Sequence, residues 1–203
     1  SDPFGPYVSE TIIFRNYKAE NFSLFGNIDY FLADNLKLAF GLRWENWNSK
    51  YNDSNKESFN PSDNMNGGKI SLIKYIDKSN IYFSIARGYK QGGFNLGLDA
   101  TDNSIRDSLI FDPEFLTNYE IGLTSNTNNS NINYSAVLFY SKREDQQVLI
   151  SKQVDPTDPN TFSYLTQNAA QGENFGLELS SNYFVSDNLN LYANVGLLKT
   201  KIK

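Results

Sequence analysis

The chain has no cysteine and no histidine, and it contains a single methionine. The absence of cysteine excludes disulfide bonds, thiolate nucleophiles and cysteine metal sites. The absence of histidine excludes Ser–His–Asp catalysis and imidazole metal ligands. Carboxylates, lysines and hydroxyls remain for chemistry. The carboxylate pairs Asp112/Glu114 and Glu173/Glu178 are of the kind that glycosidases use, but nothing fixes their separation, and the acidic stretch 48–66 lacks the D-x-D-x-D spacing of a calcium loop. We therefore predict no enzymatic activity, no catalytic residues, no metal site and no cofactor.

Long apolar runs are also missing from the sequence. No window holds the roughly 18 uninterrupted apolar residues of a transmembrane helix, which excludes spanning by helices only. Residues 1–10 lack the basic start and apolar run of a signal peptide, so we expect the chain to begin after processing or inside a longer protein. A net charge of −5 and a pI near 4.8 disfavour nucleic-acid binding.

Aromatic residues are abundant in a chain that is polar on average. The sequence has 13 Tyr and 15 Phe, yet its mean hydropathy is −0.50. Apolar residues recur with a period of two, as in Leu36, Leu38, Phe40, Leu42 and Trp44. Such alternation predicts β-strands with one apolar face and one polar face. We expect strands at residues 20–32, 36–50, 68–76, 80–91, 115–126, 131–150, 161–184 and 189–202, with a further strand around 8–17.

Short and long connections alternate along the chain. The short turns are rich in Asp, Asn and Ser and lie at residues 33–35, 77–80, 126–130 and 186–188. The long polar stretches between them are residues 48–67, 92–114 and 151–160. In an up-and-down barrel all short turns then lie at one end and all long loops at the other, which is the asymmetry of bacterial outer-membrane barrels.

One hairpin sequence occurs twice. Residues 21–38 (NFSLFGNIDYFLADNLKL) are echoed by residues 174–191 (NFGLELSSNYFVSDNLNL), and both contain Y-F-x-x-D-N-L-x-L. The apolar residues keep the same parity across each turn, so we expect an odd number of turn residues, namely three-residue A-D-N and S-D-N turns. This register places Asp29 opposite Lys37, with both side chains on the polar face.

Five segments resemble motifs of one protein family. ARGYKQGGFN (86–95) resembles the strand end S/A-x-G-[FY]-K-x-G-G-[FY]-N, and FDPEFLTNYEIGLTSN (111–126) resembles the strand start P-E-x-x-x-x-Y-E-x-G-x-K/T-S. GLRWE (41–45), FYSKREDQQVLI (139–150) and ENFGLELSSNYFVSDNLNL (173–191) resemble two further strands and a hairpin. The five segments follow the order found in TonB-dependent receptor barrels and cover most of the chain.

The resemblance implies an all-β fold, a partial antiparallel up-and-down transmembrane β-barrel with about eight of the roughly 22 strands of such a barrel. It implies a place in the bacterial outer membrane and the uptake of a scarce nutrient, by default a ferric siderophore. The expected partners are a small-molecule or metal-chelate substrate, TonB acting through a plug domain, and outer-membrane lipid and lipopolysaccharide. The plug domain and the final strands are expected to lie outside residues 1–203.

Two alternative functions remain open at this point. A porin-like or small closed outer-membrane barrel would show the same alternation of turns and loops, and a terminal strand ending in Phe or Trp would favour it. A soluble all-β carbohydrate-binding module would also alternate, although predicted strands of more than a dozen residues are longer than β-sandwiches usually use.

Four candidate binding residues lie where a predicted strand meets the 92–114 loop: Arg87, Tyr89, Lys90 and Gln91. Basic and aromatic side chains at this place suit an anionic ligand such as a ferric siderophore. The alternative is an interface girdle, in which Tyr lies at the membrane surface and Arg and Lys meet lipopolysaccharide phosphates.

Residues 143–147 continue a second predicted strand beyond the bilayer, where they either reach the ligand or form a solvated extension. The complete set of predicted substrate-binding residues is Arg87, Tyr89, Lys90, Gln91, Asn95, Arg143 and Asp145. We predict a structural role inside the barrel for Asp29, Lys37, Arg43, Glu45, Asn118, Glu120, Asn174 and Glu178, because the polar groups of a channel interior need hydrogen-bond partners.

Overall fold

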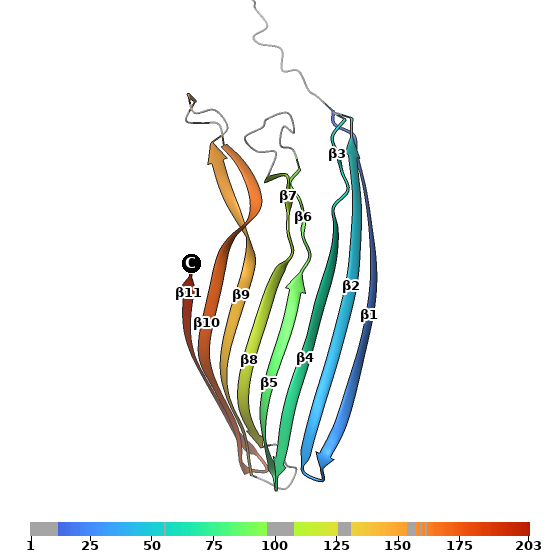
Figure 1. Ribbon diagram of the computed structural model, residues 1–203. Coiled ribbons are helices and arrows are strands. Elements are labelled where there is room, and N and C mark those ends of the chain that lie inside the picture. The colour runs from blue at the N-terminus through green and yellow to red at the C-terminus, as the bar shows by residue number, and fades with distance from the viewer. Residues whose placement is uncertain are drawn as a thin grey trace, which may run out of the picture.

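Eight long antiparallel strands form a curved sheet in the computed structural model (Figure 1). They are β1 (Arg15–Ala33), β2 (Leu36–Asp53), β4 (Ser62–Ile76), β5 (Ser79–Lys90), β8 (Glu114–Ser125), β9 (Ile132–Gln153), β10 (Phe162–Ser186) and β11 (Leu189–Ile202). Each long strand pairs with the next one along the chain, which confirms the predicted up-and-down order. The structure describes residues 12–54, 56–96, 108–125, 131–153, 157–158, 160 and 162–203.

Three two-residue strands complete the fold. β3 (Ser58–Phe59) pairs with the end of β2, while β6 (Gly93–Phe94) and β7 (Ile110–Phe111) pair with each other in a separate small sheet. The predicted long loops therefore contain regular structure that the period-two pattern did not indicate.

In the part of the chain that is described, no helix has the length and apolar character needed to cross a membrane.

Strand boundaries agree with the prediction within a few residues, except at the long-loop ends of β1, β2 and β4. The β1–β2 ladder continues as far as the pair Arg15↔Asp53, because each polar strand end supplies the backbone partner of the other. The expected strand at 8–17 is therefore only the start of β1: residues 12–14 are not in a strand, and residues 8–11 lie outside the described residues.

Short turns and long connections lie at opposite ends of the sheet, as predicted (Figure 1). The described short turns are residues 34–35, 77–78 and 187–188. The connections between β2 and β4, between β5 and β8 and between β9 and β10 all lie at the other end. We call this other end the loop end of the sheet.

The repeated hairpin is built in the same way both times, but its turns are not the predicted three-residue turns. Ala33 pairs with Leu36 across a two-residue Asp-Asn turn, and a bulge follows between Phe31 and Ala33. The second copy has the same turn between Ser186 and Leu189 and a bulge between Phe184 and Ser186. One bulged residue next to a two-residue turn shifts the parity as a third turn residue would, so the predicted faces are correct.

The predicted pairing of Asp29 with Lys37 is wrong by two residues. Asp29 pairs with Ala39, and Phe31 pairs with Lys37. The two charged side chains still meet diagonally on the polar face, with Lys37 Nζ 3.0 Å from Asp29 Oδ2. A three-residue turn at residues 33–35 would also pair Phe31 with Lys37, so the expected pairing did not follow from the predicted turn.

One row of apolar residues runs across all eight long strands. The residues of this row are successive partners in the backbone ladders, so their side chains share one face of the sheet: Tyr30, Leu38, Leu72, Phe83, Ile121, Leu138, Leu177 and Leu197. Ile121 is 51% exposed and Leu197 is 61% exposed, so no second layer of protein covers these positions in the structure. This exposure is what a surface that contacts lipid requires.

The opposite face of the sheet is polar and internally hydrogen-bonded. Asn118 Nδ2 donates to Glu120 Oε1 at 2.7 Å, and Ser141 Oγ donates to Asn118 Oδ1 at 2.7 Å. Ser84 is 1% exposed and lies opposite Glu120. The period-two reading of the sequence therefore assigned the faces of these strands correctly.

The β9–β10 hairpin exchanges its faces partway along its length. Bulges between Asn168 and Gly172 add one residue to each strand, and Asp145 at the bulge has a φ of 53°. Between the short-turn end of the sheet and the bulges, odd positions of β9 such as Val137 are on the polar face. Between the bulges and the loop end the faces are exchanged: Leu149, at an odd position, is 71% exposed, while its neighbour Ile150 packs against Leu165. This reversal has no counterpart in the sequence prediction.

The two faces predict different costs for the same substitution at one depth. Leu138→Arg places a cation on the apolar face and should cost about 2–4 kcal/mol of folding free energy near the bilayer midplane. Val137→Arg should cost far less, because Val137 lies opposite Glu178 on the polar face. The measurement is the equilibrium folding of the full-length protein into lipid vesicles, and equal costs for the two variants would refute the assignment of faces.

Candidate functional site

Part of the connection between β5 and β8 lies over the polar face at the loop end of the sheet. We call its described residues 91–96 and 108–113 the strap; they contain β6 and β7. In Figure 1 these two short strands lie between β3 on one side and the upper part of β9 and β10 on the other. The strap contacts the sheet on both of these sides.

The first contact is a cluster of aromatic rings. The Phe94 ring of the strap lies 5.3 Å from the ring of Tyr51, 5.8 Å from that of Phe59 and 5.6 Å from that of Tyr17, between centroids. Tyr51 is only 1% exposed and has the same parity in β2 as Glu45, which places it on the polar face. Aromatic packing of this kind adds to the stabilisation that the buried area itself supplies.

The second contact uses the side-chain amide of Asn95 as a strand partner. Asn95 Nδ2 donates to the backbone oxygen of Thr166 at 2.9 Å, and the Thr166 N–H donates to Asn95 Oδ1 at 2.7 Å. The same Nδ2 donates to the backbone oxygen of Ser108 at 2.7 Å. Asn95 thus bonds both backbone groups of Thr166, as a neighbouring strand would.

Further side-chain amides join the strap to the β9–β10 hairpin. Gln147 Nε2 donates to the backbone oxygens of Gln91 and Asp112, at 2.8 and 3.0 Å. Asn168 bonds both the N–H and the C=O of Asp112, at 2.7 and 2.8 Å. Leu109 of the strap and Leu165 of β10 form a buried apolar contact next to these amides. The strap is therefore held at both sides of the polar face.

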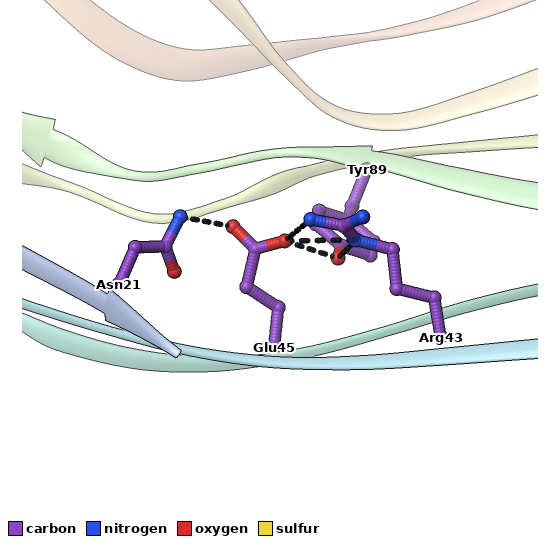
Figure 2. Close-up of polar contacts among 4 residues, drawn as sticks. All are labelled: Asn21, Arg43, Glu45 and Tyr89. Carbon is purple, nitrogen blue, oxygen red and sulfur yellow. Dashed lines mark hydrogen bonds and ion pairs between the residues drawn. The ribbon is translucent and has the colours of Figure 1, made fainter. Parts of the chain in front are cut away.

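A cluster of polar side chains converges on Glu45 on the same face (Figure 2). Glu45 accepts hydrogen bonds from Asn21 Nδ2 at 2.6 Å, from Arg43 Nε at 2.9 Å and from the Tyr89 hydroxyl at 2.8 Å. Tyr89 comes from β5 and passes over β4, where a Cβ on Gly67 would lie 3.1 Å from its ring. The lack of a side chain at Gly67 thus lets Tyr89 reach β2.

A second carboxylate, Glu114, orders the base of the strap. Arg143 Nε lies 3.2 Å from Glu114 Oε1, and the Gln147 N–H donates to Glu114 Oε2 at 2.9 Å. Lys90 is the ladder partner of Glu114, so strand alternation places it on the polar face. Its neighbour Tyr89 has the opposite parity and reaches this face only because its ring passes over Gly67. Arg43, Lys90 and Arg143 give the polar face near the strap three cations.

The seven predicted binding residues do not form one cluster in the structure. Tyr89, Lys90 and Arg143 are on the polar face, and Asn95 and the backbone of Gln91 belong to the strap. Asp145 lies at the β9 bulge, where its backbone oxygen accepts from Asn168 Nδ2 at 2.8 Å. Arg87 lies on the other face, with its guanidinium carbon 4.4 Å from the centre of the Phe115 ring.

Sequence reasoning missed the residues that hold the strap. Phe94 and Gln147 lie in segments that the sequence singled out, but their contacts with the sheet and the strap were not predicted, and neither were those of Asn168. A bond from a side chain to a distant backbone leaves no periodic pattern. Arg43 and Glu45 were expected to be structural, and their alternation with Leu42 and Trp44 placed them on the polar face. Chemically, the site offers hydrogen bonds, cations and aromatic rings; among the described residues no group of three or more His, Cys, Asp or Glu side chains could hold a metal ion.

The fold and the site together define a class of protein. An up-and-down sheet with one bare apolar face, and with a loop segment folded over its polar face, is the wall of a membrane β-barrel whose interior is polar. The chain matches the family model described as "TonB dependent receptor-like, beta-barrel" over residues 1–202. It belongs to this family of bacterial outer-membrane barrels, so the polar face is inward and the apolar face is toward lipid.

Similar proteins include receptors for siderophores. The chain is 24% identical over 185 residues to the probable TonB-dependent siderophore receptor PiuA of Acinetobacter baumannii, covering 85% of this chain and 23% of PiuA. It is 26% identical over 193 residues to the pesticin receptor of Yersinia enterocolitica, covering 89% of this chain and 26% of that receptor. The chain thus spans about a quarter of the length of the curated relatives that it matches.

A solved structure supports the fold. The ferric yersiniabactin uptake receptor FyuA from Yersinia pestis aligns with a TM-score of 0.72 and 21% identity, covering 94% of this chain and 28% of FyuA. The family match and this likeness decide against a porin-like barrel and against a soluble carbohydrate-binding module.

The Asn95 amide predicts a measurable change in hydrogen exchange. Asn95→Ala removes the acceptor of the Thr166 N–H, so the backbone amide of Thr166 should exchange roughly fivefold faster, as expected for the loss of one hydrogen bond. Asn95→Asp keeps an acceptor but faces two backbone oxygens with a carboxylate, so it should also loosen the strap. Exchange is followed by mass spectrometry on the full-length protein in detergent.

The control for this experiment is Asn60→Ala, which removes an exposed amide in the neighbouring connection. It should leave exchange at Thr166 unchanged. If Asn95→Ala also left exchange at Thr166 unchanged, the strap would not be held by this amide.

The Glu45 cluster predicts a stability difference between two carboxylate deletions. Glu45→Ala leaves Arg43 and Tyr89 without their shared acceptor and should cost about 1–3 kcal/mol of unfolding free energy. Glu45→Gln should cost less, because an amide oxygen still accepts. The matched deletion Glu20→Ala breaks only an exposed ion pair with Lys18 and should have little effect. Urea unfolding in detergent measures all three, and equal losses for Glu45→Ala and Glu20→Ala would contradict the cluster's role.

Proposed function

We propose that the chain is part of the wall of a receptor that takes up a ferric siderophore across the outer membrane. The family match over residues 1–202 is the observation that carries this proposal. The names of the relatives support the cargo class, since PiuA is named a probable siderophore receptor and FyuA a ferric yersiniabactin uptake receptor. In this role the wall binds and guides its cargo without acting as an enzyme.

We propose further that the cargo meets the inward face beside the strap. Ferric siderophores of the anionic kind need cations and hydrogen-bond donors, and Lys90 and Arg143 supply both below the strap. Tyr89 and Asn95 hold the neighbouring structure in place through their bonds to Glu45 and Thr166. Gln91 and Asp145 act through backbone oxygens that accept from Gln147 and Asn168.

The remaining parts of the receptor belong to the proposal as well. The chain spans about a quarter of its relatives, which leaves room for further barrel strands and for the plug on which TonB acts. The inward polar row with Asn118, Glu120 and Glu178 offers hydrogen-bond partners for such a plug. Outer-membrane lipid is the proposed partner of the apolar face.

The proposed cargo is tested by uptake of radioactive iron. The full-length receptor is expressed in cells that lack their other siderophore receptors, and a panel of iron-loaded siderophores is supplied in turn. At least one of them should be taken up only when both the receptor and TonB are present. Uptake of none of the ferric chelates, together with uptake of another TonB-dependent cargo, would contradict the iron assignment.

Removing an inward positive charge should weaken the binding of the cargo. Lys90→Gln and Arg143→Gln should each weaken binding of the transported ferric siderophore by about tenfold or more, because a hydrogen bond to a charged group contributes roughly 1.5–3 kcal/mol. Lys74→Gln is the matched control, since Lys74 lies at the opposite end and donates to Asn35 Oδ1. Equal affinity of all three variants and the unaltered receptor in a titration would exclude Lys90 and Arg143 from the binding site.

A further inference from the structure

Two aspartates meet at the start of the strap. A Cβ on Gly92 of the strap would lie 2.8 Å from Asp63 Oδ2 and 3.1 Å from the backbone carbon of Asp112, so both residues lie against this one position. The same Cβ would lie 2.5 Å from the backbone oxygen of Phe111. Asp63 Oδ2 and the Phe111 oxygen are both hydrogen-bond acceptors, so an ionised Asp63 has no proton to donate to the strap that covers it.

Among the described residues no cation forms an ion pair with either carboxylate. The ion pairs near the strap join Arg43 to Glu45 and Arg143 to Glu114. Asp53, at the end of β2, accepts from the Tyr51 hydroxyl at 3.0 Å, and β3 has no charged residue. The charged groups of the polar face around this point are Arg43 and Glu45 of β2, Lys69 of β4, Lys90 of β5, Glu114 of β8 and Arg143 of β9. The charge that acts on Asp63 is that of Asp112, which has the same sign.

The position of Asp63 allows it to hold a proton. Asp63 is the second residue of β4, at the loop end of the sheet. The outward residues beside it, Ser62 and Asn64, are polar, and the large apolar outward residues of the strand begin at Ile70, so Asp63 is outside the membrane-spanning part of the chain. Burial, and then the nearby Asp112 carboxylate, raise the pKa of Asp63 above its ordinary value.

The contacts that hold the strap elsewhere are uncharged. Phe94 packs against aromatic rings, Asn95 bonds the backbone of Thr166, and Leu109 packs against Leu165. None of these contacts depends on a proton that is exchanged between acid and neutral pH. The ion pair of Glu114 with Arg143 would weaken on protonation, which is opposite in sign to the effect expected of Asp63. Variants of Asp63 therefore separate the two.

We infer that the strap is a lid that docks onto the polar face when Asp63 is protonated and loosens when Asp63 is ionised. A protonated Asp63 carries no charge beside Asp112 and can donate to an acceptor of the strap. Because docking raises the pKa of Asp63, the strap is held most firmly below the ordinary pKa of an aspartate and less firmly as the pH rises through the raised value. Covering of the cargo by this lid rests on the proposed function, whereas the motion of the strap requires no cargo.

The test is the distance between two spin labels in the full-length receptor, in detergent and without cargo. One label replaces Ile110 of the strap, which is 48% exposed, and the other replaces Lys142 of β9, after any other cysteine has been replaced. A docked strap gives one narrow distance, and a loosened strap adds a broad population. The broad population should grow about twofold between about pH 4.5 and about pH 8, the effect of one pair of like charges at a protein surface.

Variants assign the pH response to the two aspartates. Asp63→Asn should keep the narrow distance at both pH values, because an amide is uncharged and can donate. Asp112→Asn should act in the same direction but less strongly, since the burial of Asp63 remains. Glu20→Gln removes an exposed carboxylate at the same end of the sheet and should leave the response unchanged.

A pH response that persists in Asp63→Asn, or a distance that does not change with pH in the unaltered receptor, would overturn the proposal. Unchanged migration of the folded barrel in gels shows that each variant folds. A receptor that takes up no ferric siderophore would contradict the proposed cargo and leave these distances unaffected, so the two proposals fail separately.

Discussion

The backbone sets the constraint on which this structure depends. A peptide group that faces hydrocarbon has no water to bond, so a strand can cross a membrane only if its neighbours satisfy every N–H and C=O. Each long strand from β2 to β10 meets this demand by pairing on both sides with its neighbours in the sheet. Because a paired strand points successive side chains to opposite faces, the ladders also create the apolar face, with its row from Tyr30 to Leu197, and the polar face behind it.

At the loop end the same demand is met by side chains instead of strands. In the upper part of β10, Asn95 bonds the Thr166 backbone as a neighbouring peptide would. Gln147 and Asn168 do the same for the backbone of Asp112. The strap can lie on the polar face because these amides and the packing of the Phe94 ring against Tyr51 hold it.

The sequence predicted what depends on a period of two, and little else. Faces, strand order and the repeated hairpin follow directly from alternation and from the Asp-Asn turns, so they are correct even where the turn is two residues and a bulge. A bulge within a strand gives no sequence signal of the kind a turn gives. The exchange of faces in the β9–β10 hairpin beyond Asp145 was therefore not predicted. Arg87 and Tyr89 show the limit most clearly: they have the same parity in β5, yet only Tyr89 reaches the inward cluster, because the β4–β5 ladder ends at the pair Gly68↔Arg87.

The lack of cysteine in this chain makes single-cysteine labelling the most direct test of the two faces. Nitroxide labels placed one at a time on β9 of the full-length receptor, with any other cysteine replaced, report contact with lipid-soluble oxygen or with a water-soluble relaxing agent. Labels at Tyr134, Ala136 and Leu138 should contact lipid, and those at Ser135 and Val137 should not. Above the bulge the parity should reverse, with Leu149 outward and Ile150 inward. Uniform accessibility along β9, or one parity throughout, would contradict the account.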